Sequence, residues 1–348
     1  MHLRLTTLYA LSITALAAGC MDNTGLASET CSEHLVLTTT PQGWAERSTD
    51  LVVEFGRAAH RAQDQIVAQG APQQVIAKFA YGRVDKDLKG EWVDIYARRT
   101  RCGPWERLGS ERTSQDGEHG KVGGVQDDGG RIFFTIPSAR ALPLGRTPLR
   151  LVVRGDHSQA AMDLYVVEPS TQVVVFDIDG TLTTDDNQIV QEVAAEVLHR
   201  SYVPQARPGA LALVRHYAEQ GFPVLYLTGR PDLLQRITTR WLSQQGFPQG
   251  PLRLADHLHE VLPQITGVGT FKAKVLTAWQ GPQHGLQIHA AYGNAPTDIY
   301  AYETAQIPKD HTFIIGPHGG EGDTVGLQSY PAHLSTLQAN RQRPQSRD

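Results

Sequence analysis

The strongest constraint on the fold of this chain is an uninterrupted apolar run at residues 173–176, Val-Val-Val-Phe. A parallel strand that is buried on both faces has such a run, whereas a strand with one face in water alternates apolar and polar residues. After it, helical patterns at residues 189–199, 209–220, 232–244, 271–279 and 297–305 alternate with strand patterns at residues 224–227, 288–292 and 312–315. This alternation predicts an α/β domain with a parallel sheet.

The chain before Pro169 has a different pattern. Stretches in which apolar and polar residues interleave are separated by turns rich in glycine and aspartate. They predict strands at residues 51–55, 75–81, 92–97, 131–136, 148–153 and 162–167, with one short helix at residues 57–69. Short strands at such intervals predict an immunoglobulin-like β-sandwich. We therefore expect a β-sandwich domain at residues 49–169 and an α/β domain at residues 170–336.

The N-terminal residues 1–19 are typical of a bacterial secretory signal: a basic start, an apolar stretch too short for the roughly 20 residues of a membrane span, and small residues before Cys20. A cysteine in that place resembles the lipobox of lipoproteins, whose mature chain begins at the acylated cysteine. An ordinary signal peptide is the alternative. Because Met21 rather than an aspartate follows Cys20, we expect an exported protein that is lipid-anchored in the outer membrane and faces the periplasm. The mature chain would have a tether at residues 20–48, a disordered tail at residues 337–348 and no transmembrane helix.

Charge and cysteine content restrict the partners and the compartment. The formal net charge of −4 carries no electrostatic signature of nucleic-acid binding. If Cys20 is acylated, Cys31 and Cys102 remain, and an even number of cysteines suits an oxidising compartment. We expect a disulfide between Cys31 and Cys102, with two unpaired buried thiols as the alternative.

Four polar segments stand at the ends of predicted strands or at the start of a helix. They are Asp177-Ile178-Asp179-Gly180-Thr181, Thr228-Gly229-Arg230, Lys272, and Gly293-Asn294-Ala295-Pro296-Thr297-Asp298. Ligands bind at the carboxyl ends of the strands in an open α/β sheet. We therefore expect one pocket to collect all four segments.

These residue types favour phosphoryl transfer. Asp177 and Asp179, with Asp298 nearby, can hold Mg²⁺, which prefers a few oxygen ligands together with water and substrate phosphate. Asp177 can attack phosphorus to form an aspartyl-phosphate. Lys272 and the Thr228 hydroxyl can neutralise and orient the phosphoryl oxygens. Asp179 can protonate the leaving alkoxide and then deprotonate the hydrolytic water.

The four segments resemble the motif set of the haloacid dehalogenase superfamily, with Asp177 in the place of the nucleophile. Residues 176–183, 271–272 and 292–302 resemble the lipin-type phosphatidate phosphatases. A longer resemblance, over roughly residues 50–336, is to the carboxyl-terminal region of the membrane-associated phosphatidylinositol transfer proteins of the retinal-degeneration-B type. It is carried by residues 79–82, 142–145, 150–157, 207–210, 226–232 and 244–248.

The resemblance implies a β-sandwich packed before a lipin-type domain, phosphatidic acid as the recognised lipid, and Mg²⁺ as the cofactor. It places the metal ligands at Asp177, Asp179, Asn294 and Asp298, and substrate contacts at Gly180, Thr181, Gly229 and Arg230. Arg230 could instead pair locally, and Lys274 could replace Lys272 as the phosphate cation. In the animal transfer proteins the nucleophile aspartate is missing, whereas Asp177 is present here.

Spacing gives an independent indication of the substrate. Residues 181–228 and 228–272 are largely used by predicted helices and leave no room for a large cap domain. An uncapped site suits a lipid headgroup at a membrane surface better than an enclosed small molecule. The sequence therefore predicts a Mg²⁺-dependent phosphoric monoester hydrolase acting on phosphatidic acid or a related lipid phosphate. The alternatives are a non-catalytic phosphatidate-binding lipoprotein and a phosphatase for soluble phosphomonoesters.

Overall fold

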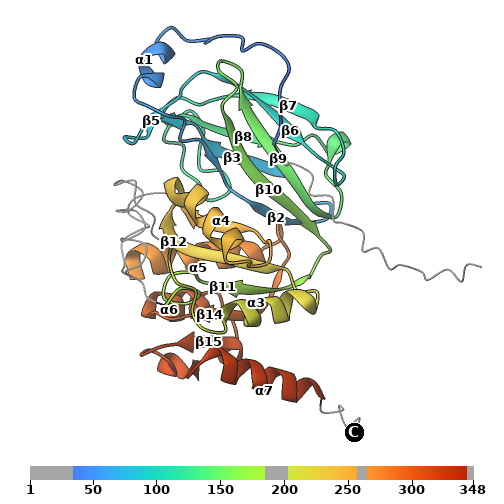
Figure 1. The fold of residues 1–348 in the computed structure, drawn as a ribbon, viewed down its shortest axis with the longest axis vertical. Coiled ribbons are helices and arrows are strands. Elements are labelled where there is room, and N and C mark those ends of the chain that lie inside the picture. The colour runs from blue at the N-terminus through green and yellow to red at the C-terminus, as the bar shows by residue number, and fades with distance from the viewer. Residues whose placement is uncertain (1–33, 185–202, 257–264, 343–348) are drawn as a thin grey trace, which may run out of the picture. The chain divides into compact units, whose positions relative to one another are not determined.

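The N-terminal half of the chain forms two β-sheets in a computed structural model that describes residues 34–184, 203–256 and 265–342 (Figure 1). One sheet has the order β2-β10-β9-β6-β7 and the other the order β1-β3-β8. The five strands of the first are β2 Gln65–Ala68, β10 Gln159–Val167, β9 Gly145–Val153, β6 Trp92–Ala97 and β7 Glu106–Arg112. The second contains β1 Arg61–Ala62, β3 Gln74–Lys78 and β8 Arg131–Thr135. In the sequence, β3 is followed by a hairpin of β4 Ala80–Tyr81 and β5 Lys86–Asp87.

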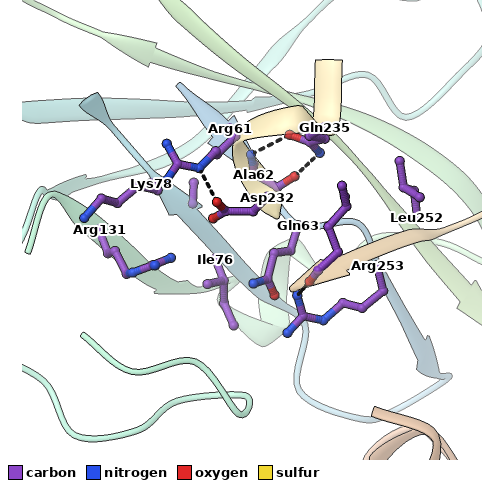
Figure 2. A pocket seen from close by; sticks show the side chains of 12 residues that line it. Arg61, Ala62, Gln63, Ile76, Lys78, Arg131, Asp232, Gln235, Leu252 and Arg253 are labelled. Atoms are coloured by element: carbon purple, nitrogen blue, oxygen red, sulfur yellow. Dashed lines mark hydrogen bonds and ion pairs between the residues drawn. The ribbon is translucent and has the colours of Figure 1, made fainter. Parts of the chain in front are cut away.

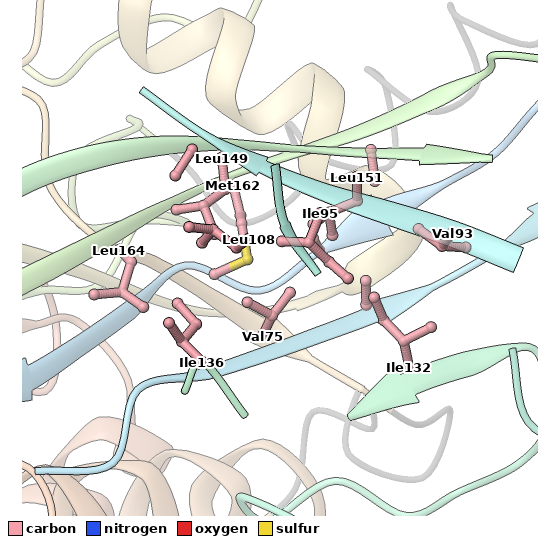
Figure 3. Packing of buried hydrophobic residues seen from close by; sticks show 14 of the residues in the cluster. Val75, Val93, Ile95, Leu108, Ile132, Ile136, Leu149, Leu151, Met162 and Leu164 are labelled. Carbon is pink, nitrogen blue, oxygen red and sulfur yellow. The ribbon is translucent and has the colours of Figure 1, made fainter. Parts of the chain in front are cut away.

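The core of this half lies between the two sheets. Alternate residues of β6 are fully buried, as a strand with one face toward a core requires. Figure 3 shows Val93 and Ile95 of β6 and Leu151 of β9 among side chains from the other sheet, such as Val75 and Ile132. The predicted β-sandwich is confirmed.

The C-terminal half contains a six-stranded parallel sheet of order β13-β12-β11-β14-β15-β16. Its strands are β11 Gln172–Phe176, β12 Val224–Pro231, β13 Leu252–Ala255, β14 Gln287–Gly293, β15 Thr312–Ile315 and β16 Val325–Leu327. One face is covered by α3 Ala210–Glu219, α4 Gln235–Gln244 and α7 Tyr330–Gln342, and the other by α5 Thr270–Gln280 and α6 Pro296–Thr304. The predicted α/β class is confirmed.

Strand β11 shows why its apolar run is continuous. Val173 and Val175 belong to the core beneath α5 and α6, whereas Val174 and Phe176 belong to the core beneath α3 and α4. All four residues have no exposed surface. The two halves also share a core, because Ile66 of β2 packs in the cluster of α5. The described residues from His34 onward belong to one compact unit.

Two predictions about the first segment are wrong. Residues 51–55 were expected to be a strand, but the chain there forms helix α1, Thr49–Val53. The carboxylate of Glu91 accepts hydrogen bonds from the Ala45 and Glu46 amides and, at 2.6 Å, from the Thr49 hydroxyl, which holds this turn in place. Residues 57–69 were expected to be a helix, but they contain β1 and β2 because β1 pairs with β3 and β2 pairs with β10.

Other elements were not predicted or lie outside the described residues. Strands β7, β13 and β16 and helix α7 had no counterpart in the sequence analysis, and α7 includes residues 337–342, which were assigned to the disordered tail. The predicted helix at residues 189–199, the signal segment and Cys20 fall outside the described residues. Cys102 is disulfide-bonded, and its predicted partner Cys31 also falls outside them. No helix in the described part of the chain is long and apolar enough to span a membrane.

Candidate active site

Three of the four predicted segments converge on one buried cluster. Asp177 follows the end of β11, Lys272 lies in the first turn of α5, and Asp298 lies in the first turn of α6. The Lys272 Nζ atom is 2.6 Å from Asp177 Oδ1 and 2.6 Å from Asp298 Oδ1. None of the three side chains is more than 4% exposed. Lys272 is therefore the cation of this cluster, whereas Lys274, the alternative, is exposed on another side of α5.

Burial and charge act together in this cluster. Burial raises the pKa of Asp177 to about 8; Lys272 opposes this effect, and Asp298 and Asp179 add to it. Burial disfavours the ammonium form of Lys272, but the two carboxylates raise the pKa of Lys272 above its usual value. Lys272 therefore supplies too little positive charge to offset the effect of burial on Asp177. An additional cation would correct that deficit.

The loop that carries Asp177 is held by hydrogen bonds between its backbone and groups from distant parts of the chain. The Asp177 amide donates to the Tyr292 carbonyl at 3.0 Å. Arg207 donates to the carbonyls of Gly180, at 2.5 Å, and Thr181, and the Tyr330 hydroxyl of α7 donates to the Thr181 carbonyl at 3.1 Å. Sequence reasoning did not give Arg207 or Tyr330 a role in the site. Arg207 lies in a segment shared with the related family, but that segment has no recognisable chemistry.

Thr181 and Asn294 connect the first and last segments. The Thr181 hydroxyl lies 2.9 Å from Asp177 Oδ2 and 3.0 Å from Asn294 Oδ1, so it can donate to either of them. Asp298 uses its second oxygen, Oδ2, to accept the Asn294 and Ala295 amides at 3.0 Å each. The carboxylate thus caps the start of α6 while its other oxygen faces Lys272. Five of the predicted site residues are brought together in this way: Asp177, Thr181, Lys272, Asn294 and Asp298.

Asp179 points to a different partner. Its carboxylate pairs with Arg230, at 2.8 Å to Nη2 and 2.9 Å to Nε, and accepts the Thr228 hydroxyl at 3.1 Å. The Arg230 side chain has no exposed surface and also donates to the Thr238 hydroxyl. Of the two roles considered for Arg230, this structure shows local pairing. Asp179 was also predicted to be a metal ligand, but its side chain lies against Arg230 rather than in the Lys272 cluster.

The two glycines of the site are required by geometry. Gly180 has a φ of 70°, in the left-handed region that favours glycine. At Gly229 a Cβ atom would lie 2.7 Å from a methyl group of Val268, in the π-helical turn Ile265–Gly269 that precedes α5. These glycines allow the backbone to pass closely beside the cluster, where a phosphate could approach it.

Mg²⁺ is the cofactor that the resemblance implies. Among the residues that the structure describes, no group of three or more His, Cys, Asp or Glu side chains is arranged to hold a metal ion. Mg²⁺ nevertheless needs only one or two carboxylates in addition to water and phosphate oxygens. Asp177 and Asp298, with Asn294 beside them, provide this oxygen set, and their deficit of positive charge is what such an ion would relieve. The donor set therefore fits Mg²⁺.

The β-sandwich directly contacts the carboxyl edge of the parallel sheet. Figure 2 shows Arg61 of β1 directed at Asp232, with Nε 2.8 Å from Oδ1, and Gln235 exchanging two hydrogen bonds with the Ala62 backbone. Asp232 stands two residues after Arg230, in the 3₁₀ turn Asp232–Leu234. A second carboxylate, Asp85, accepts both Arg61 Nη atoms at 2.6 and 2.7 Å. The sandwich thus fixes the segment that carries Thr228 and Arg230. No sequence motif indicated this contact between the domains.

Two protein-family models match the chain. The PITM 1-3 β-sandwich domain matches residues 58–166, and the PITM 1-3 LNS2 domain matches residues 174–316. The second match contains all eight of the predicted catalytic and substrate-binding residues and both of the remaining metal ligands. The first contains Arg61 and most of the strands of the sandwich.

Two relatives align with most of this chain. Protein retinal degeneration B of Drosophila melanogaster is 35% identical over 304 residues, which cover 85% of this chain and 21% of that protein. Mouse membrane-associated phosphatidylinositol transfer protein 3 is 34% identical over 308 residues, which cover 86% of this chain and 28% of that protein. The chain therefore spans 21% to 28% of the length of these two relatives.

A solved structure shares the general arrangement only weakly. D,D-heptose 1.7-bisphosphate phosphatase from B. bronchiseptica, complexed with magnesium and phosphate, aligns with 49% of this chain and 99% of that chain. The identity is 15% and the TM-score is 0.36.

Proposed function

We propose that this chain, which carries the β-sandwich and lipin-like LNS2 domains of the membrane-associated phosphatidylinositol transfer proteins, is a Mg²⁺-dependent phosphatase for phosphatidic acid or a related lipid phosphate. The observation that carries the proposal is the Asp177–Lys272–Asp298 cluster. It joins a nucleophile, a fixed cation and a second carboxylate within 2.6 Å contacts, and it is sequestered from water. A module that only binds phosphate does not need a buried carboxylate where the phosphate would sit, because two anions repel each other.

The proposed reaction has two displacements. Asp177 attacks the phosphorus atom, a P–O bond to Asp177 forms, and the ester P–O bond breaks. Asp179 gives its proton to the departing alkoxide. Asp179 then removes a proton from a water molecule, which attacks the phosphorus atom, releases inorganic phosphate and restores the Asp177 carboxylate.

Other side chains stabilise charge in both displacements. Lys272 and the Thr228 hydroxyl would hold the phosphoryl oxygens. Mg²⁺, held by Asp177, Asp298 and Asn294, would supply positive charge beside those oxygens and keep Asp177 ionised. Arg207 and Tyr330 keep the nucleophile loop in its position through the Gly180 and Thr181 carbonyls.

A lipid is the proposed substrate for two reasons. The relatives are named as membrane-associated phosphatidylinositol transfer proteins, and the sequence has no room for a large cap over the site. We propose further that acylation of Cys20 holds the chain at the outer membrane, facing the periplasm, where a lipid phosphate is within reach. The alternatives are binding of phosphatidate without turnover and hydrolysis of soluble phosphomonoesters.

The test is phosphate release from phosphatidate-containing vesicles by the chain from Met21 onward, with Mg²⁺ and with chelator. Asp177→Asn should abolish release. Asp310→Asn is the matched control, because Asp310 is exposed at the opposite end of β15. Vesicle binding without release by any of the three proteins would overturn the phosphatase proposal and favour a sensor. Faster release from glycerol 3-phosphate than from vesicles would favour the soluble substrate.

A further inference from the structure

A cavity lies away from the Asp177–Lys272–Asp298 cluster, between the β-sandwich and α4. Its volume is about 740 Å³, within the usual range of sites for small molecules. Strands β9 and β10 provide one wall, and α4 with the following residues 247–252 provides the other. Its lining includes neither Asp177 nor Lys272. The cavity is therefore a separate place at which a ligand could bind.

The lining is rich in arginine, although the whole chain is slightly acidic. Arg146 and Arg150 come from β9, and Arg236 and Arg240 come from α4. They face two carboxylates, so the ionised cavity has a net charge of +2. Arg236 and Arg240 are four residues apart and therefore point the same way from α4, at one turn's separation. Guanidinium groups in such an arrangement suit an anion with several oxygens.

The two carboxylates are already used by the protein. Asp64 is half-buried and accepts the amide of Asp163, at 2.8 Å, and that of Leu252, at 3.1 Å. Asp163 pairs with Arg146 at 2.7 Å. Arg150 donates to the Leu149 carbonyl. Arg236 and Arg240 of α4 are exposed and line the same cavity.

We propose that this cavity binds a phosphate monoester that carries an apolar group. A phosphate monoester has a charge of about −1.5 to −2 at pH 7, which matches the cavity, whereas a carboxylate brings only one charge. The apolar group would lie against Met162, Leu242 and Phe247, which line the same space. A lipid phosphate and a soluble organic phosphate share this chemistry.

The position of the cavity gives the ligand a mechanical role. Helix α4 directly follows the segment that holds Thr228, Arg230 and Asp232. Gln235, which lines the cavity, also makes the two hydrogen bonds to Ala62 of the sandwich. A ligand bound to arginines on both walls would therefore join the domains beside the catalytic segment.

The experiment counts binding sites by calorimetry in the chain from Met21 onward with Asp177→Asn, which prevents turnover. The probes are dihexanoyl phosphatidate, glycerol 3-phosphate and, as the neutral control, dihexanoyl phosphatidylcholine. We expect two sites for dihexanoyl phosphatidate, and one after Arg236→Glu with Arg240→Glu. The matched control is Arg47→Glu with Arg83→Glu, two exposed arginines outside the cavity, which should keep both sites.

Amide hydrogen exchange locates the lost site. The ligand should protect α4 and β9 in the parent chain but not in the Arg236/Arg240 variant. Equal loss in the control pair, an unchanged count in the cavity variant, or protection confined to the catalytic edge would overturn the proposal. At least tenfold tighter binding of dihexanoyl phosphatidate than of glycerol 3-phosphate assigns the site to lipids, and the reverse order assigns it to soluble esters. If the Asp177 cluster binds no phosphate ester, we expect one site in the Asp177→Asn chain and none after Arg236→Glu with Arg240→Glu. Failure of the proposed function therefore leaves this test intact.

Discussion

The contact between Arg61 and Asp232 makes a quantitative prediction about how the two domains depend on each other. The side chains are only 9% and 13% exposed, and they join β1 to the segment that holds Thr228 and Arg230. Arg61→Met keeps most of the side-chain volume but leaves Asp232 without its cation. Removing one partner of a fully buried ion pair costs about 3–5 kcal/mol, because a buried charge is left uncompensated. Partial exposure reduces this, and we expect a loss of about 2–3 kcal/mol in the free energy of unfolding.

The pH dependence of that loss has a definite sign. Burial already raises the pKa of Asp232, and Arg61 opposes the effect. Without Arg61 the pKa of Asp232 rises further, so the folded state holds a proton that the unfolded chain releases. Stability from such a group is complete below the unfolded pKa and is lost as pH rises through the folded pKa. Arg61→Met should therefore cost more at pH 8 than at pH 5.

A double-mutant cycle measures this coupling. Urea unfolding of the parent, Arg61→Met, Asp232→Asn and the double variant is followed by tryptophan fluorescence. The double variant should be more stable than the sum of the single losses implies, by about 1–2 kcal/mol. Arg107→Met is the surface control, since Arg107 is 46% exposed beside Asp94, and it should cost about 0–1 kcal/mol. Additive losses, or a loss no larger than that of Arg107→Met, would refute the reasoning.

Three further predictions concern single residues. Lys272→Met should lower kcat for phosphatidate by about 10²–10³-fold, measured by phosphate release, because one fixed charge at the phosphoryl oxygens is lost. Gly229→Ala should destabilise the fold by about 1–3 kcal/mol in thermal unfolding, and Val268→Ala should restore stability by making room for the added methyl group. Burial raises the pKa of Asp64 to about 7, so its contribution is complete below about pH 4 and is lost as pH rises through 7. Asp64→Asn should make the unfolding free energy less dependent on pH between 5 and 8.

The α/β half was predictable because its local pattern and its tertiary environment agree. Strand β11 is buried on both faces, so its apolar run is continuous, and the polar residues that follow it stand at the carboxyl edge. The same holds for β12 and β14, which bring Thr228 and Asn294 to that edge. Asp177, Lys272 and Asp298 could therefore be placed in one site from sequence.

The wrong helix at residues 57–69 has a physical cause. In β2, Val67 faces the sandwich core while Ile66 faces the core beneath α5. A strand between two cores loses the alternation that identifies an exposed sheet, and its apolar residues can be mistaken for a helical stripe. Strand β7 was missed for the opposite reason. It lies at a sheet edge, carries mostly charged and polar residues, and buries only Leu108.

The supporting contacts of the site could not be predicted, because they join residues that are far apart in the chain. Arg207 acts on backbone carbonyls 23–27 residues away, and Tyr330 acts on one 149 residues away. Every residue has a backbone carbonyl, so the residue type does not show which carbonyls accept a side-chain hydrogen bond. The role of Arg61 could not be predicted for the same reason, since its partner Asp232 belongs to another domain.

The pairing of Asp179 with Arg230 bears on how the proposed reaction would begin. Arg230 has no exposed surface and is also bonded to Thr238, so it cannot follow a substrate. Asp179 is 18% exposed, and within the described structure its carboxylate is bonded by the side chains of Arg230 and Thr228, so it is the partner that can turn. In its present position the Asp179 carboxylate is paired with a guanidinium, whereas a general acid must carry a proton that it can donate. The arriving phosphoryl group is itself an anion that Arg230 can bind. If the phosphate replaces the Asp179 carboxylate on Arg230, Asp179 becomes free to accept a proton. The two roles considered for Arg230, local pairing and headgroup contact, would then follow one another during the reaction.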